Sequence, residues 1–296
     1  MRLGGVLGAW MRNYVIAPRY RAGVDGYVTT SDGVRLHTVT LAGPPTSGVT
    51  VLIAPGFGHW HRHSKLVEFA SAMAAHANVV VLELRGHGHS GGASTLGSVE
   101  SADVAAAVAA VPAGQALVLV GVSLGAAASV VYCGTAAERG LRVPDAVVSI
   151  SGPGWWTPER PRQGVARLLR AASSGITRGG MRLFMRVRLV DVAGLGWCDP
   201  IDVVANIAPA PLLLVHDPDD WYFGADQVEA LAARAGTTAT VWWRPGHGHA
   251  SDLFDGELYR RIAADVIGPI AAQATDRAGS ATPSRRSPGA SSKSPS

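Results

Sequence analysis

Six short apolar runs recur along this chain, and most of them are rich in β-branched residues. Neighbouring residues of a strand point to opposite faces, so a run that is apolar throughout suits a parallel strand covered by helices on both sides. Helix-like segments, among them residues 65–77 and 99–111, lie between several of the runs. This alternation predicts a doubly wound α/β sheet, in which ligands bind at the carboxyl ends of the strands. The runs cover residues 49–55, 78–84, 116–122, 145–151, 211–217 and 238–244.

The segments around these runs complete the predicted organisation. Residues 26–43 read as an antiparallel hairpin that turns at Asp32-Gly33, which brings the expected sheet to about eight mostly parallel strands. We assign residues 23–272 to one α/β domain with a helical insertion at about 153–207. Residues 1–22 form a basic N-terminal segment, and residues 273–296 form a Ser/Pro/Arg-rich tail that we expect to be disordered.

The charge distribution argues against a nucleic-acid-binding protein. The formal net charge is +4, but the basic residues gather in the N-terminal segment, the insertion and the tail, which leaves the rest of the chain acidic. No apolar stretch approaches the roughly 20 residues of a membrane span, and the N-terminus is a poor signal peptide. Cys133 and Cys198 are too few for a disulfide framework, so we expect a cytoplasmic protein.

Residues 121–125 read Gly-Val-Ser-Leu-Gly, which fits the GxSxG nucleophile elbow. The five-residue pattern is weak alone, but here an apolar run precedes Ser123 and a helix-like segment follows it, as the elbow requires. A serine hydroxyl is a poor nucleophile at neutral pH, so it needs a base within hydrogen-bond reach and a third group that orients the base.

With this elbow in its context, the chain resembles the α/β-hydrolase fold superfamily from about Gly26 to Ile270, with the serine nucleophile of esterases and monoacylglycerol lipases. The resemblance implies an acid after a late strand and a histidine after the last strand. Asp220 is the preferred acid, although no glycine occupies position 217, which leaves Asp219 and Asp217 as alternatives. Two histidines follow the last predicted strand; the Gly-His pattern favours His249, and His247 stays open.

The resemblance also implies an oxyanion hole made of backbone N–H groups. One donor is Leu124, directly after the nucleophile, and the other is Phe57 in a loop that resembles the family's His-Gly-x-Gly loop. Proline at position 55 replaces the family's histidine, which puts the support of this loop in doubt. The stretch 83–92 resembles the family's Asp-x-Arg-Gly-x-Gly-x-Ser motif, with Glu83 in place of aspartate, and we assign it no chemistry.

In the family, the insertion is a lid that shapes the substrate pocket. Here residues 153–200 combine Trp155, Trp156, Leu168 and Phe184 with eight arginines, a combination that fits either a solvated lid or peripheral contact with an anionic membrane. Histidines also cluster at 59–63 and 87–89, but the triad already accounts for the site, so we expect no metal and no cofactor.

These features predict a serine hydrolase that cleaves a small carboxylic ester or a monoacylglycerol-like lipid through an acyl-enzyme on Ser123. Peptidase, thioesterase and carbon–carbon bond hydrolase activities use the same triad, because fold and triad do not select the substrate. The alternative from another class is a small-molecule-binding or partner-binding protein that keeps the fold with little or no turnover.

Overall fold

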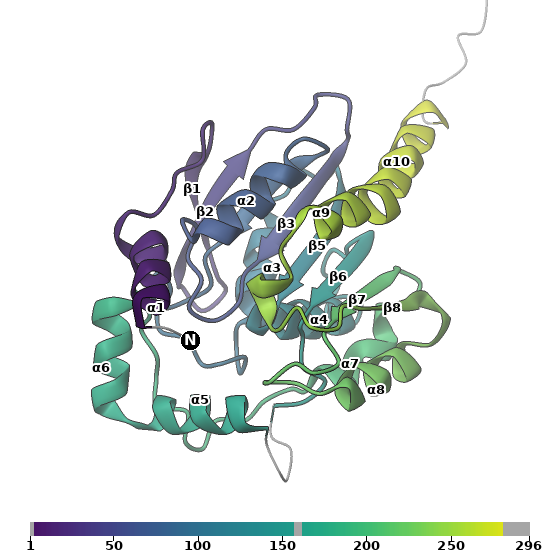
Figure 1. Cartoon of the computed structure of the whole chain (residues 1–296). Helices are drawn as coiled ribbons and strands as arrows, with labels where there is room; N and C mark the ends of the chain where they lie inside the picture. The colour runs from purple at the N-terminus through teal and green to yellow at the C-terminus, as the bar shows by residue number, and fades with distance from the viewer. Residues whose placement is uncertain (1–2, 157–161, 281–296) are drawn as a thin grey trace, which may run out of the picture.

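The computed structural model of this chain describes residues 3–156 and 162–280. Its eight strands form one sheet in the order β1-β2-β4-β3-β5-β6-β7-β8 (Figure 1). β2 pairs antiparallel with both β1 and β4, and every other neighbouring pair is parallel. The predicted doubly wound, mostly parallel α/β sheet is therefore confirmed. The strands are β1 (Val24–Thr29), β2 (Arg35–Leu41), β3 (Val49–Ala54), β4 (Asn78–Leu82), β5 (Ala116–Val122), β6 (Ala146–Ile150), β7 (Leu212–His216) and β8 (Ala239–Trp243).

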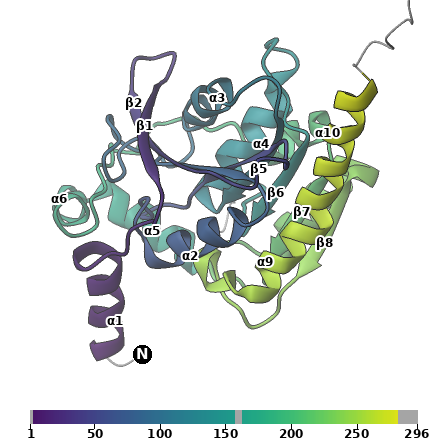
Figure 2. The ribbon, with the colours of Figure 1, turned by 90° about the horizontal axis from the view of Figure 1, so that it is seen from above.

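Helices cover both faces of the sheet (Figure 2). The α-helices are α1 (Leu3–Trp10), α2 (Ser64–Met73), α3 (Ser101–Ala109), α4 (Leu124–Ala136), α5 (Gln163–Ser173), α6 (Gly175–Phe184), α7 (Pro200–Val203), α8 (Ala225–Ala235), α9 (Gly256–Ile262) and α10 (Gly268–Ser280). Shorter helical turns are η1 (Met11–Val15), η2 (Val204–Ile207), η3 (Gly236–Thr238), η4 (Ala250–Leu253) and η5 (Ala263–Ile267).

The apolar runs divide their side chains between two cores, one on each face. On β5, Leu117 and Leu119 pack into the core that α3, α4 and α8 cover. Val118 and Val120 pack into the core beneath α2, α9 and α10. All four side chains are fully buried. The two-residue period of a strand thus explains why this run lacks polar positions.

The segment between β6 and β7 carries α5, α6 and α7, so the helical insertion predicted at 153–207 lies between these two strands. Isolated bridges tie it to the loop after β4, at His87 with Val187 and at Ser94 with Leu189. Its helix α6 also lies beside α1, where the Trp10 indole donates a hydrogen bond of 2.8 Å to the carbonyl of Phe184 (Figure 1). Among the described helices, none combines the length and apolarity that crossing a bilayer demands.

The C-terminal helix extends into the segment that composition assigns to the tail. α10 ends at Ser280, so residues 273–280 are helical, in contrast to the disorder expected for 273–296. Ala274 packs against the core, and Arg277 forms an ion pair of 2.9 Å with Asp145. These contacts supply tertiary support that composition cannot reveal. Residues 281–296 lie outside the described part of the chain.

α4 begins directly after β5 and lies very close to the end of β3. A Cβ atom on Gly125 would overlap the carbonyl oxygen of Ala54, and one on Gly121 would lie 2.5 Å from the Cα atom of Ala126. Both glycines of the GxSxG pattern are therefore required by close backbone approach. The position of the loop after β3 relative to the end of β5 depends on this contact.

We predict that Gly125→Ala lowers the free energy of unfolding by about 1–3 kcal/mol, because the added methyl group would have to push backbone atoms apart. Urea denaturation followed by circular dichroism measures the change. Gly114→Ala is the matched control, since a Cβ atom there meets no atom within 4 Å. Equal stability of the two variants would contradict the close approach of α4 to β3.

Candidate active site

Ser123 occupies the sharp turn between β5 and α4. Its backbone has φ 51° and ψ −112°, a left-handed conformation that is unfavourable for a residue with a side chain. The turn is held in place by the Ser123 N–H, which donates a hydrogen bond of 2.8 Å to the carbonyl of Ile150 on β6. The strand–turn–helix context predicted for the elbow is present, and it places the serine at the carboxyl end of the sheet.

His249 follows β8 and connects Ser123 to Asp220. Its Nε2 lies 2.9 Å from Ser123 Oγ, and its Nδ1 lies 2.6 Å from Asp220 Oδ2. A carboxylate can only accept hydrogen bonds, so Nδ1 carries the proton and Nε2 is free to accept the proton of the serine hydroxyl. The rings of Tyr222 and Phe223 flank the imidazole, with centroids 4.5 and 5.7 Å from it. The arrangement suits a serine activated by a general base.

Asp220 is fully buried, and its second carboxylate oxygen is also occupied. Oδ1 accepts the backbone N–H groups of Tyr222 at 2.7 Å and Phe223 at 3.3 Å, while Oδ2 faces His249. These hydrogen bonds compensate the loss of hydration and hold the carboxylate in one orientation. The aspartate is therefore preorganised to orient the imidazole and to stabilise its protonated form.

The alternatives for the acid and the base occupy other positions. His247 Nε2 accepts a hydrogen bond of 2.6 Å from Arg244, and its ring is partly exposed in the loop after β8. Asp217 accepts the N–H groups of Asp219 at 2.9 Å and Gly248 at 2.6 Å. Asp217 thus connects the loop of the acid to the loop of the histidine. The structure brings Ser123, His249 and Asp220 together, and it gives Asp217 a different task.

The loop that carries Phe57 lies opposite Ser123. A Cβ atom on Gly56 would lie 3.4 Å from that of Ser123, so the loop can approach the nucleophile closely. Across from it, α4 begins at Leu124, and the first N–H groups of a helix find no partner inside the helix. The two N–H groups predicted to form an oxyanion hole thus belong to segments on either side of the serine.

His87 supplies support for this loop, and the sequence analysis missed it. Its Nδ1–H donates to the carbonyl of Arg85 at 3.0 Å, so Nε2 accepts the N–H of Gly58 at 3.1 Å. Burial lowers the pKa of His87, which keeps the ring neutral and able to accept. Tyr14 donates to the carbonyl of Gly58 at 2.6 Å. The only signal in the sequence was the Arg-Gly-x-Gly motif, in which position 87 is variable.

A cavity of about 270 Å³ opens beside Ser123 and His249. The insertion contributes Trp156 and Leu168 to its wall, as expected for a segment that shapes the pocket. Phe184, in contrast, lies outside it and packs against Trp10 at a ring-centroid distance of 6.3 Å. Apolar side chains share the wall with polar ones, among them Ser251 and Asp252, so the cavity offers an apolar surface to only part of a group attached to the reacting carbonyl. The apolar lining consists of Phe57, Leu96, Leu124, Trp156, Leu168, Tyr222, Phe223 and Ala250.

His59 also lines this cavity; it is half-buried, and its ring stacks against the buried ring of His63 at a centroid distance of 4.1 Å. Burial and the neighbouring histidines hold the pKa of His59 well below its ordinary value, and burial lowers that of His63 to about 4. Both rings are therefore neutral near pH 7. His59 Nε2 lies 3.4 Å from Ser251 Oγ, which links the loop after β3 to the turn that follows His249.

Residues 51–265 match the model of the Alpha/beta hydrolase family. The chain belongs to this family. The matched residues include the elbow, the loop after β3 and both late loops, so this alpha/beta hydrolase has its Ser–His–Asp arrangement at the positions expected from the order of its strands. A search of the curated proteins returned no match.

Solved structures show the same fold at low sequence identity. The esterase Pf2001 of Pyrococcus furiosus is 18% identical, with a TM-score of 0.61 over 82% of this chain and 90% of that one. The esterase RhEst1 of a Rhodococcus species is 18% identical, with a TM-score of 0.60 over 83% and 98%. A bacterial membrane phospholipase A is 17% identical, with a TM-score of 0.61 over 83% and 87%. These likenesses establish the fold of the hydrolase.

We predict that His87→Ala slows the reaction of Ser123 with a fluorophosphonate by about tenfold to a hundredfold, because the Gly58 N–H loses its acceptor and the Phe57 loop shifts. The measurement is the second-order labelling rate. His76→Ala is the control, because this exposed histidine precedes β4 and so lies at the opposite end of the sheet from Ser123. A His87→Ala rate equal to wild type, in folded protein, would show that the loop does not need this support.

Proposed function

We propose that this alpha/beta hydrolase is a serine hydrolase that cleaves carboxylic esters. The observation that carries the proposal is the continuous hydrogen-bond chain from Ser123 Oγ through His249 to the buried Asp220. Such a chain serves to activate a hydroxyl for attack on a carbonyl carbon. The esterases among the solved structures of the same fold agree with this reaction class.

In the proposed reaction, Ser123 Oγ attacks the ester carbonyl while His249 Nε2 takes its proton. Asp220 stabilises the resulting imidazolium, and the N–H groups of Leu124 and Phe57 donate to the developing oxyanion. His249 then gives the proton to the departing alkoxide, so the alcohol leaves and an acyl-enzyme remains. Water attacks the acyl-enzyme with the same assistance, which releases the carboxylic acid and regenerates the serine. The sequence of steps needs no cofactor.

The cavity favours a small ester over a monoacylglycerol-like lipid as the substrate. Its volume of about 270 Å³ falls below the roughly 300 Å³ at which pockets for drug-sized ligands begin. A long acyl chain would therefore extend beyond it unless the insertion moved. The same triad also suits peptidase, thioesterase and carbon–carbon bond hydrolase chemistry, and a binding protein with little turnover would keep the cavity without using Ser123.

The decisive test combines fluorophosphonate labelling with hydrolysis of p-nitrophenyl esters of increasing acyl length. We expect wild type to label and to prefer short chains, Ser123→Ala to be inert, and His249→Ala to lose on the order of 10⁴-fold in kcat. His247→Ala is the matched control and should keep its activity. Folded wild-type protein that binds an ester analogue without labelling or turnover would instead favour the binding protein.

We further propose that α1, η1 and α6 attach this hydrolase to anionic membranes from the cytoplasmic side. Ile176 and Leu183 are seven residues apart on α6 and are 92% and 74% exposed. Leu7, Met11 and Val15 form a second exposed apolar stripe along α1 and η1. Arginines at 12, 182 and 186 add positive charge beside these stripes. Cys133 and Cys198 are unpaired, in keeping with a reducing compartment.

We expect the protein to sediment with anionic liposomes at low salt and less at high salt, where screening weakens the attraction. Ile176→Ser/Leu183→Ser should reduce the bound fraction severalfold. Val143→Ser, which removes an exposed apolar side chain elsewhere, is the control. Failure of the wild type to sediment at low salt would contradict membrane attachment and leave the esterase proposal untouched.

A further inference from the structure

Three histidines and a glutamate from three separate segments converge beside a second cavity. They are His37 on β2, His61 in the loop after β3, and Glu83 and His89 around the turn after β4. One potential ligand atom from each of the four side chains lies within 4.8 Å of all the others. The histidines that cluster in the sequence at 59–63 and 87–89 thus belong to two groups in space. His61 and His89 lie beside Glu83, whereas His59, His63 and His87 lie on the side of Ser123 and of the loop that carries Phe57.

The His37 ring provides an observation that points to a missing partner. Its side chain is 1% exposed, and its Nε2 lies 2.9 Å from Asp25 Oδ1. Because the carboxylate only accepts, Nε2 carries a proton there. The other nitrogen, Nδ1, is buried and makes no hydrogen bond, although it lies 3.3 Å from Glu83 Oε2. A histidine that binds a metal ion with one ring nitrogen commonly donates a hydrogen bond from the other nitrogen to a carboxylate, which orients the ring. His37 has this arrangement, because Nε2 faces Asp25 and Nδ1 makes no hydrogen bond.

Glu83 is fully buried and held in a fixed orientation. Its Oε1 accepts the N–H of His61 at 2.9 Å and faces His61 Nδ1 at 2.6 Å, and its Oε2 accepts the N–H of His89 at 2.7 Å. These contacts direct both carboxylate oxygens toward the histidines of the group.

The three rings are gathered around this carboxylate. Ring centroids lie 4.6 Å apart for His37 and His61, 5.0 Å for His37 and His89, and 5.1 Å for His61 and His89. Ligand atoms about 2.0–2.1 Å from a tetrahedral ion are separated by roughly 3.3 Å, so ligand atoms that lie up to 4.8 Å apart here would move closer together when an ion binds.

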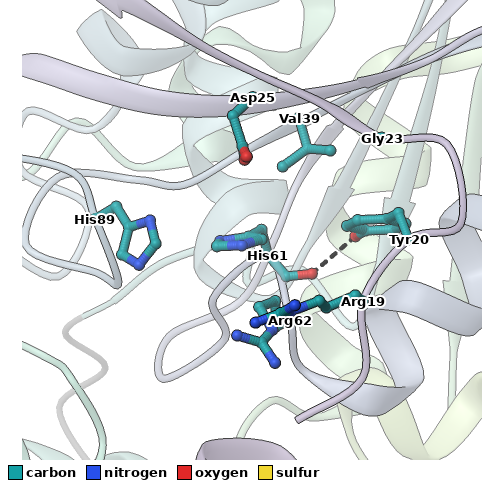
Figure 3. Close-up of a pocket in the computed structure, with 8 residues that line it drawn as sticks. All are labelled: Arg19, Tyr20, Gly23, Asp25, Val39, His61, Arg62 and His89. Atoms are coloured by element: carbon teal, nitrogen blue, oxygen red, sulfur yellow. Dashed lines mark hydrogen bonds between the residues drawn. The ribbon is translucent and has the colours of Figure 1, made fainter.

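The charge and the access of the group also suit a divalent cation. A dication bound by three neutral imidazoles and Glu83 would keep a charge of about +1, which Asp25 behind His37 offsets, while Arg19 and Arg62 add positive charge to the same cavity. His61, His89 and Asp25 line a cavity of about 350 Å³, and Figure 3 shows them around it together with Arg19, Tyr20 and Arg62. This cavity leads from solvent to the group, so an ion has a path of entry.

We propose that His37, His61, Glu83 and His89 form a zinc site with Asp25 as the orienting partner of His37. Nitrogen and carboxylate ligands suit Zn²⁺, and four protein ligands are typical of a structural zinc site. The ion would join β2, the loop after β3 and the turn after β4. It stands apart from the chemistry of Ser123, so the site is independent of the proposed esterase activity.

The test is calorimetric titration of ZnCl₂ into the full chain, purified without a histidine tag and stripped with a chelator. We expect one ion per chain with micromolar or tighter affinity. His89→Ala removes an exposed ligand and should weaken binding more than about 100-fold, and Asp25→Asn should weaken it about 10–100-fold. His76→Ala, which removes an exposed histidine elsewhere, should bind as wild type does.

Two further measurements separate this site from incidental binding. Zn²⁺ should raise the melting temperature of wild type by several degrees and leave that of His89→Ala unchanged, since only the intact site favours the folded state. Bound Co²⁺ should show the intense visible bands of a four-coordinate site. Binding that disappears in His249→Ala would place the ion at the active site and overturn the proposal. So would the absence of saturable binding to wild type, or equal binding by His89→Ala and His76→Ala.

Discussion

The close packing of α4 against the end of β3 is the contact on which the rest of the site depends. It requires glycine at 121 and 125, because a side chain at either position would overlap backbone atoms. It also forces Ser123 into its left-handed conformation, so the hydroxyl is raised above the sheet. A looser junction would move the loop after β3 away from the nucleophile. One steric constraint therefore sets the position of both the serine and the segment that carries Phe57.

The remaining groups reach the serine because parallel strands end at one edge of the sheet. β7 and β8 deliver Asp220 and His249 through loops that are joined to each other by the hydrogen bond from the Gly248 N–H to Asp217. Asp217 does not contact His249, but its hydrogen bond with Gly248 fixes the loop after β7 relative to the loop after β8. Preorganisation of this kind places His249 beside Ser123 without a further conformational cost, as the proposed mechanism requires.

The turn after β4 connects the active site to the proposed zinc site. His87 faces the loop after β3 through Gly58, whereas His89, two residues later, faces His37 and His61. Glu83, at the start of the same turn, accepts N–H groups from both flanking loops. Proline at position 55 replaces the family's histidine, and His87 on the turn after β4 supports the loop after β3 through Gly58. The hydrogen bonds of His87 and Glu83 restrict these loops to one arrangement.

The sequence by itself determined the sheet, the elbow and the positions from which the triad comes. Those features follow from local rules, namely the two-residue period of buried strands and the need for glycine at a tight turn. Only the tertiary structure shows that Asp220 and His249, and not Asp219 and His247, form the hydrogen-bond chain to Ser123, because the directions of neighbouring loop side chains depend on contacts that composition does not record. The same holds for His87, for the helical residues 273–280, and for the division of the clustered histidines between the surroundings of Ser123 and those of Glu83. Each depends on contacts between segments distant in the chain, which no local pattern records.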